Sequence, residues 1–296
     1  MQLFVLDKNI QRSFHAKVQF KKIFIAHSYK FRTDIDVLRT ALWFDCLKSH
    51  LNVISAYGVR NSVVPKHINE NQYNPFQEIK WAKYQTGKHT PTKRVAELAE
   101  SVVPNSRVIL DHVLWRILKA PTPTPQMIKS YLSQLNSDVK GVLYTNQMGR
   151  LRRKKVDSQL YKALERVSSL DALAALILLL REGEENKFKF RSLIHSIYNT
   201  CLIVFSIELY SKYNDYIYSI FYDRVFSRLD DEIYDLKNWD NQFAEKLIML
   251  NSLCEKLANK VGFDESQPKP RSKYLQKLLD GDYGLPIADA LAPNWV

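Results

Sequence analysis

The segment SLDALAALILLLREG, residues 169–183, restricts the possible folds of this chain more than any other. Its residues are apolar almost all the way around a helix, which is typical of a helix enclosed on every side. The apolar run is shorter than the roughly 18 residues that a helix needs to cross a bilayer. The rest of the chain must therefore supply amphipathic helices that cover this one.

Segments with helical spacing of apolar residues occur on both sides of this central helix. The chain has 8 glycines in 296 residues, which disfavours a turn-rich β fold. We therefore predict an all-α protein, in which the central helix belongs to a C-terminal helical bundle. The other expected helices cover residues 34–50, 75–86, 90–103, 107–119, 126–135, 188–214, 215–238, 239–262 and 271–281, with a short helix or turn near 55–59.

The segment APTPTP, residues 120–125, is the clearest boundary in the sequence. Its three prolines cannot continue a helix and favour a stiff, extended spacer. We therefore divide the chain into a helical domain at 1–120, a Pro-rich linker at 121–125 and a helical bundle at 126–296.

Positive charge is concentrated in the first part of the chain. The net charge is +12, but the first 170 residues hold 28 Lys and Arg against 12 Asp and Glu, whereas the remainder is mildly acidic. Clustered Lys and Arg are the electrostatic footprint of phosphate binding. The densest cluster is RLRRKK, residues 150–155, which we expect to form a loop or a helix N-terminal arm at the entry to the bundle.

A sequence of helix and turn signals occupies residues 75–102. A helix that starts at Pro75 ends at Gly87, and a basic link leads through Pro91 to a second helix. This order resembles the second half of Xre/Cro-type helix-turn-helix DNA-binding domains. The matching residues are Trp81 and Tyr84, directed inward, then Gly87, Lys88, Pro91, Val95, Leu98 and Ala99.

With the helix at 34–50 as the first helix of the family, the resemblance extends over about residues 34–102 and implies a helix-turn-helix-like N-terminal domain. One feature departs from the family. The candidate second helix, near 55–59, lies 15 residues before Pro75, so that residues 60–74 would be an insertion.

The resemblance implies a recognition helix in the major groove, with Gln77, Lys80 and Lys83 directed to base edges. Lys88, Lys93 and Arg94 would then lie near the phosphates, where the first turn of a helix also offers free N–H groups. The alternative for these cations is an ordinary solvated surface. With the RLRRKK cations, the candidate nucleic-acid-binding residues are Gln77, Lys80, Lys83, Lys88, Lys93, Arg94, Arg150, Arg152, Arg153, Lys154 and Lys155.

Sequence signals for metal or cofactor chemistry are absent. Cys46, Cys201 and Cys254 are far apart, and no Cys/His spacing is suitable for zinc. We therefore expect no metal, no cofactor and no catalytic residues. In MQLFVLDKNIQRS, Asp7 and Lys8 interrupt the only apolar run, so we expect no signal peptide, no membrane partner and a cytoplasmic location.

These observations predict a non-enzymatic DNA-binding protein, with DNA rather than RNA as its partner and the bundle mediating assembly. A bacterial regulator, or an accessory of a mobile element or antiviral defence system, fits the helix-turn-helix resemblance. Seven tyrosines between residues 198 and 234 favour a protein-partner or self-association surface, or else half-buried packing. They are Tyr198, Tyr210, Tyr213, Tyr216, Tyr218, Tyr222 and Tyr234.

Two other functions remain open. An RNA-binding protein, or a subunit of a guide-RNA complex, would use the same basic surface without reading base edges. The segment RSLIH, with Arg191 and His195, resembles the Arg/His pair of HEPN ribonucleases, although its spacing is one residue shorter than the usual motif. That resemblance implies a helical ribonuclease or toxin.

Overall fold

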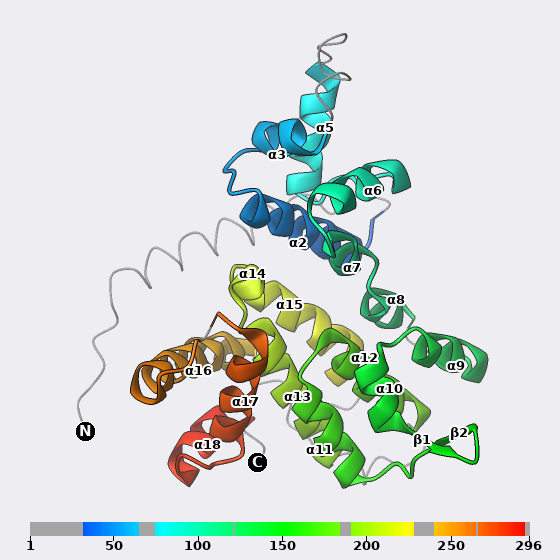
Figure 1. Ribbon diagram of the computed structural model, residues 1–296, viewed down its shortest axis with the longest axis vertical. Coiled ribbons are helices and arrows are strands. Elements are labelled where there is room, and N and C mark those ends of the chain that lie inside the picture. The colour runs from blue at the N-terminus through cyan, green and yellow to red at the C-terminus, as the bar shows by residue number, and fades with distance from the viewer. Residues whose placement is uncertain are drawn as a thin grey trace. The chain divides into compact units, whose positions relative to one another are not determined.

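The computed structural model describes residues 32–64, 75–120, 122–183, 191–227, 240–264 and 266–293, and the following refers to these residues. The fold is all-α, as predicted, with one two-stranded antiparallel hairpin among the described residues (Figure 1). The chain divides into two compact units, one up to Val103 and one from Pro104.

The first unit is built from four described helices: α2 (Asp34–His50), α3 (Ala56–Val63), α5 (Pro75–Gln85) and α6 (Lys93–Val102). The N-cap residue of α2, Thr33, accepts a hydrogen bond from the Asp36 backbone N–H, and Ser55 caps α3 in the same way. Both α2 and α3 pack against α5, and α3 also contacts α6.

Three aromatic side chains form the centre of this unit. The rings of Trp43 and Trp81 are stacked with centroids 6.4 Å apart, and Tyr84 meets both of them edge-on. All three side chains are buried, which confirms the predicted inward orientation of Trp81 and Tyr84. Such pairs contribute about 0.5–1.5 kcal/mol each beyond the apolar area that they bury.

Of the α6 residues that match the helix-turn-helix pattern, Ala99 alone is buried. Ala96 and Ala99 are buried, whereas Val95 and Leu98 are half-buried and Val102 is exposed. The buried side of α6 is thus formed by two small side chains, and the larger side chains lie at its edges.

Gly87 ends α5 and holds the link to α6 against α2. Its φ of +68° is in the left-handed region, and a Cβ on it would lie 2.5 Å from the Val37 carbonyl oxygen. Arg32 donates hydrogen bonds to the Gly87 carbonyl, to Thr90 Oγ1 and, at 3.0 Å, to the carbonyl of Asp36. The link between α5 and α6 is therefore fixed on the N-terminal turn of α2.

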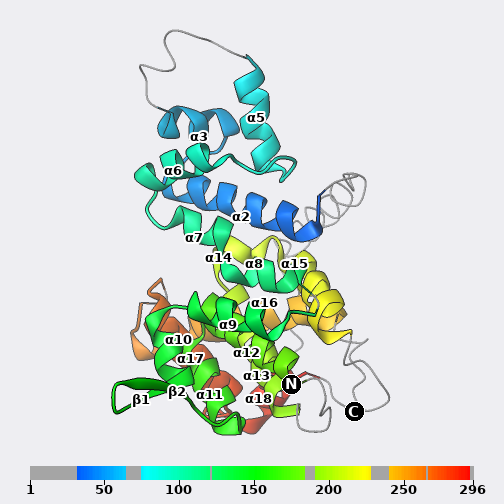
Figure 2. The same ribbon diagram turned by 90° about the vertical axis from the view of Figure 1, so that its right-hand side faces the viewer.

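The second unit surrounds the central helix α12 (Leu170–Glu182), in which residues 172–180 are all buried, as predicted. Helices α8, α9, α10, α11 and α13 pack around it (Figures 1 and 2). The other elements of this unit are α7 (Ser106–Asp111), α8 (Val113–Lys119), α9 (Pro125–Ser133), α10 (Ser137–Leu143), α11 (Ser158–Val167), α13 (Arg191–Phe205), α14 (Glu208–Ser211), α15 (Asn214–Phe221), the π-helical η2 (Tyr222–Phe226), α16 (Asp240–Val261), α17 (Pro268–Leu279) and α18 (Leu285–Leu291).

The division between the units falls earlier in the chain than the Pro-rich segment where the sequence analysis places it. The segment predicted as one helix at 107–119 is broken at His112, whose Nδ1 accepts from the Leu114 N–H, and α8 then packs on α12. Arg181 of α12 donates to the carbonyls of Ile117 and Ala120 at the end of α8. Residues on both sides of the prolines therefore belong to the second unit.

A buried carboxylate joins three helices of the second unit. The side chain of Glu165 on α11 is fully buried and accepts hydrogen bonds from four donors. These are Lys162 Nζ at 2.9 Å, Ser196 Oγ at 2.9 Å, Asn199 Nδ2 at 3.0 Å and Gln276 Nε2 at 2.6 Å. A buried charge requires such donors, so this network fixes how α11, α13 and α17 meet.

The tyrosines for which the sequence indicates either a partner surface or half-buried packing belong largely to the core. Tyr198, Tyr210, Tyr213 and Tyr218 are buried, and the rings of Tyr198 and Tyr218 pack on Phe243. Tyr216 and Tyr222 are half-buried, and Tyr234 lies outside the described residues. These side chains therefore stabilise the bundle, and most of them are inaccessible to a partner.

The RLRRKK segment is neither a loop nor a helical arm. Strands β1 (Tyr144–Gln147) and β2 (Arg150–Arg153) pair antiparallel, with Gln147 opposite Arg150. The two turn residues, Met148 and Gly149, have φ of +52° and +78°. Positive φ at both positions is typical of the type I′ turn, whose twist suits a two-residue hairpin. Local sequence rules do not indicate this turn, because Met is unusual at its first position.

The substitution Gly87→Ala tests the contact between the link and α2. We expect a loss of more than about 2 kcal/mol of unfolding free energy, because left-handed strain of about 1–2 kcal/mol adds to the clash with Val37. The control is Gly262→Ala, where φ is +78° and no atom lies within 4 Å of the new Cβ. Urea denaturation measures both, and equal losses would contradict the close approach at Gly87.

Candidate nucleic-acid interface

Several cationic groups of the first unit gather around the link between α5 and α6. Lys80 is exposed on α5, and Lys83 follows it in the last turn. Burial lowers the pKa of the His89 imidazole, and the positive charges of Lys83, Arg32 and Lys80 lower it further. These cations are therefore within electrostatic range of one imidazole. We call Arg32, Lys80, Lys83 and His89 the His89 cluster.

Two other predicted residues of this region can be placed only in part. Lys88 lies in the link beside His89 and is half-buried. Gln77 belongs to the first half of α5, where the structure describes the helix but not the position of this side chain. Its predicted role in reading a base edge therefore stays a prediction.

The N-terminus of α6 carries positive rather than negative charge. Lys93 and Arg94 are exposed in its first turn, which has no acidic residue, and the side chain of the N-cap residue Thr92 makes no capping hydrogen bond. Cations at this end oppose the helix macrodipole by about 0.3–1 kcal/mol each. The exposed pair between Lys93 and Glu97, 3.8 Å apart, offsets little of this. A bound anion would reverse the penalty.

The second group of predicted cations lies on and beside the hairpin. Arg150, Arg152 and Lys155 are exposed. Arg153 is held by Glu182, with Nη1 2.7 Å from Oε1, and Lys154 donates through Nζ to the Gly141 carbonyl at 3.2 Å. Arg150, Arg152 and Lys155 are thus exposed, with Arg152 also donating to Gln147 Oε1 at 3.3 Å, while Arg153 and Lys154 bind other elements of the protein.

Two members of the His89 cluster, Arg32 and His89, were not among the nucleic-acid-binding residues predicted from the sequence. Arg32 contacts Gly87 across a separation of 55 residues, which no local pattern indicates. His89 could have been recognised as part of a phosphate site from its position among lysines in the segment KYQTGKHTPTKR. No group of three or more potential metal ligands occurs among the described residues.

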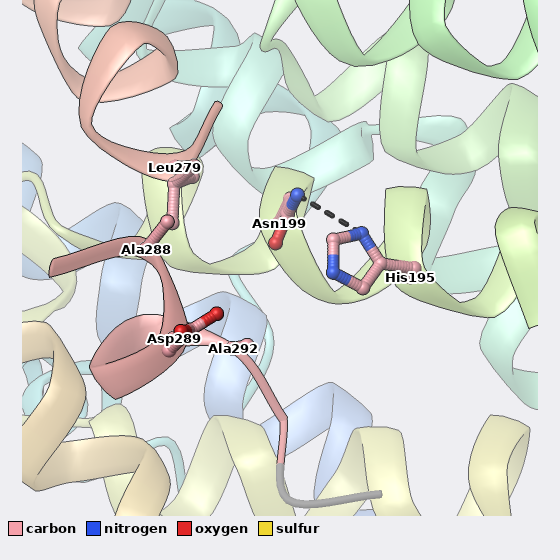
Figure 3. Close-up of a pocket in the computed structure, with 6 residues that line it drawn as sticks. All are labelled: His195, Asn199, Leu279, Ala288, Asp289 and Ala292. Carbon is pink, nitrogen blue, oxygen red and sulfur yellow. Dashed lines mark hydrogen bonds between the residues drawn. The ribbon is translucent and has the colours of Figure 1, made fainter. Parts of the chain in front are cut away.

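A separate pocket of about 180 Å³ lies between α13, α17 and α18 (Figure 3). Asn199 donates to Glu165 and also lies 3.2 Å from His195 Nδ1, so this nitrogen accepts and Nε2 carries the proton. Burial lowers the pKa of His195, and the positive charges of Lys162 and Arg191 lower it further, against an opposing effect of Glu165. The residues that line the pocket are His195, Asn199, Leu279, Ala288, Asp289 and Ala292.

This pocket bears on the ribonuclease resemblance. Arg191 lies one turn before His195 on α13 and is exposed, whereas His195 is half-buried. Burial also lowers the pKa of Lys246 to about 8, and its Nζ donates to the carbonyl of Ala292. Groups with such shifted pKa values often occur at functional sites. The placement of Asn199, however, is also explained by its hydrogen bond to Glu165, which is a structural role.

No protein-family model, curated protein or solved structure matches the chain. The resemblances to helix-turn-helix domains and to HEPN ribonucleases therefore stay predictions. Within the described ranges, no helix combines the length and the apolar character that a membrane span requires.

The charge at the start of α6 gives a prediction with two readouts. The substitution Arg94→Glu should raise the unfolding free energy by about 0.3–1 kcal/mol, because an acid suits a helix N-terminus, and should weaken binding to duplex DNA. Urea denaturation and fluorescence anisotropy with a labelled duplex measure the two effects.

The control is Arg166→Glu, which makes the same charge change in the last turn of α11. It should lower stability, because the macrodipole has the opposite sign there, and should leave DNA binding unchanged. Equal duplex affinities for the two variants would contradict an anion site at the start of α6.

Proposed function

We propose that this protein is a non-enzymatic DNA-binding protein whose first unit contacts the phosphate backbone of a duplex at the link between α5 and α6. The observation that carries the proposal is the set of cations around His89, on a link that Gly87 and Arg32 hold in place. Phosphate contacts from Lys and Arg supply most of the affinity in DNA binding.

The electrostatics of the region support this proposal. Like charges that gather on a folded surface repel one another, and a polyanion relieves that repulsion. The basic first turn of α6 supports the proposal in the same way. Its cations destabilise the free helix, and a bound phosphate would remove this destabilisation. The fixed link would present these groups with little loss of conformational entropy on binding.

The arrangement of α5 supports a role as the recognition helix. Trp81 and Tyr84 are buried against α2, whereas Lys80 is exposed, so the helix has one face for packing and one for contact. Helices α3 and α5 pack against each other, as the paired helices of a helix-turn-helix do. On this proposal Lys80 and Lys83 approach base edges, while Lys88, Lys93 and Arg94 approach phosphates.

RNA is the alternative nucleic acid for the same surface. A helix that enters the major groove requires B-form duplex, because the major groove of A-form RNA is too narrow for side-chain readout. Anisotropy titrations with duplex DNA, duplex RNA and single strands at two salt concentrations separate the two. Preference for single-stranded or duplex RNA would replace DNA with RNA in the proposal.

The ribonuclease alternative is favoured by one observation, the half-buried His195 in a polar pocket. Ribonuclease activity that is present in the purified protein and disappears in His195→Ala would replace a binding function with an enzymatic one. Assembly through the second unit, and a place in bacterial regulation, mobile elements or antiviral defence, stay hypotheses that rest on the sequence alone.

Charge reversal on α5 tests the proposed interface. We expect the pair Lys80→Glu with Lys83→Glu to weaken duplex binding at least tenfold, because each substitution loses a donor to a base edge and places a negative charge near the duplex, and to reduce the slope of log Kd against log salt. Anisotropy with a labelled duplex of mixed sequence measures both quantities.

The matched control reverses two exposed lysines of the second unit, Lys129→Glu with Lys260→Glu, and so makes the same change in net charge. Circular dichroism confirms that both variants are folded. If both pairs weaken binding equally, net charge alone drives association and the interface is wrongly placed. If neither pair weakens it, the first unit does not bind through α5.

A further inference from the structure

The hairpin exposes two apolar side chains. Met148 at the turn is fully exposed, and Leu151 on β2 is 76% exposed. The two strands project from the helices of the second unit (Figures 1 and 2). Single exposed apolar residues are common on proteins, but Met148 lies at the tip of a projecting hairpin, two residues from the exposed Arg150.

The base of the hairpin is anchored firmly. Arg153 is bound by Glu182 on α12, and this bond raises the pKa of the guanidinium. Lys154 donates from its backbone N–H to the carbonyl of Leu143 at 3.0 Å and from Nζ to the carbonyl of Gly141. The anchors hold the two strands at their base and leave the tip accessible.

The two faces of the hairpin differ in chemistry. Residues opposite each other on antiparallel strands lie on the same face, so Arg150 and Gln147 share a face with Arg152 and Thr145. Leu151 and Asn146 lie on the other face. The hairpin therefore has a cationic face, an apolar residue on the reverse and Met148 at the tip.

Met148 is an unfavourable residue for the turn that it forms. The first position of a type I′ turn requires positive φ, which Asn or Gly adopts with little strain and Met does not. The Met148 side chain is fully exposed, so packing within the chain does not compensate for this strain. Strain of this kind occurs often at functional positions.

We propose that the hairpin is a wedge for duplex DNA, with Arg150 and Arg152 against the phosphates of the minor groove and Met148 inserted between adjacent base pairs. Minor-groove proteins use this combination of flanking cations and an apolar wedge to unstack a base step and bend the duplex. The proposal rests on the proposed function and adds a second DNA contact, made by the second unit.

A topological assay tests the wedge. The protein is bound to relaxed closed-circular plasmid DNA, topoisomerase I is added, and the change in linking number is read on a gel after deproteinisation. Unstacking a base step alters the local twist, so we expect the wild-type protein to change the linking number. The variant Met148→Asn should lose at least half of this change while it retains the fold, because Asn suits the turn.

Charge removal tests the cationic face independently. The pair Arg150→Gln with Arg152→Gln should reduce the slope of log Kd against log salt by about 1.8, or 0.9 for each phosphate contact. The pair Lys129→Gln with Arg166→Gln removes two exposed charges elsewhere in the second unit and should leave the slope unchanged.

The outcomes separate this proposal from the proposed function. If the wild-type protein binds no duplex, both are wrong. If it binds duplex and responds to Lys80→Glu with Lys83→Glu, but Met148→Asn retains the full linking-number change or Arg150→Gln with Arg152→Gln leaves the slope unaltered, the wedge is wrong and the first interface stands.

Discussion

The first unit depends on the close approach of the Gly87 backbone to Val37. A side chain at this position would meet the Val37 carbonyl, so the link can lie against α2 only with glycine there. Arg32 then closes the contact by donating to the Gly87 carbonyl and to Thr90. Because this link carries Lys88 and His89 and leads into the basic start of α6, a single backbone contact determines where the cations of the first unit meet.

Stability and binding make opposite demands on these cations. The macrodipole disfavours Lys93 and Arg94 at the start of α6, and positive neighbours lower the pKa of His89. Met148 adds backbone strain at the hairpin tip. The aromatic cluster of Trp43, Trp81 and Tyr84 stabilises the first unit, and the four donors to Glu165 stabilise the second. These well-packed cores therefore offset the cost of one electrostatically unfavourable surface in the first unit and one strained turn in the second.

The sequence predicted those elements that local physical rules determine. The apolar pattern around residues 172–180 located the buried helix, and Gly87 located the end of α5. The rest depends on contacts between distant residues. Arg181 joins α8 to α12, so the Pro-rich segment does not separate the two units, and the hairpin required Met148 in a conformation that Met disfavours. At the interface, the candidate lysines were predicted, but Arg32 and its contact with Gly87 could not be.

The central claim is that DNA phosphates lie against the His89 cluster, and an NMR titration of His89 tests it most directly. The imidazole signals, assigned with His89→Gln, are followed against pH without DNA and with saturating duplex. Neighbouring cations hold the pKa of free His89 below its ordinary value, and nearby phosphates should raise it. Binding would then take up a proton, so that affinity increases as the pH falls toward the pKa of free His89. The account predicts a raised pKa in the complex, and an unchanged pKa under saturating duplex would contradict it.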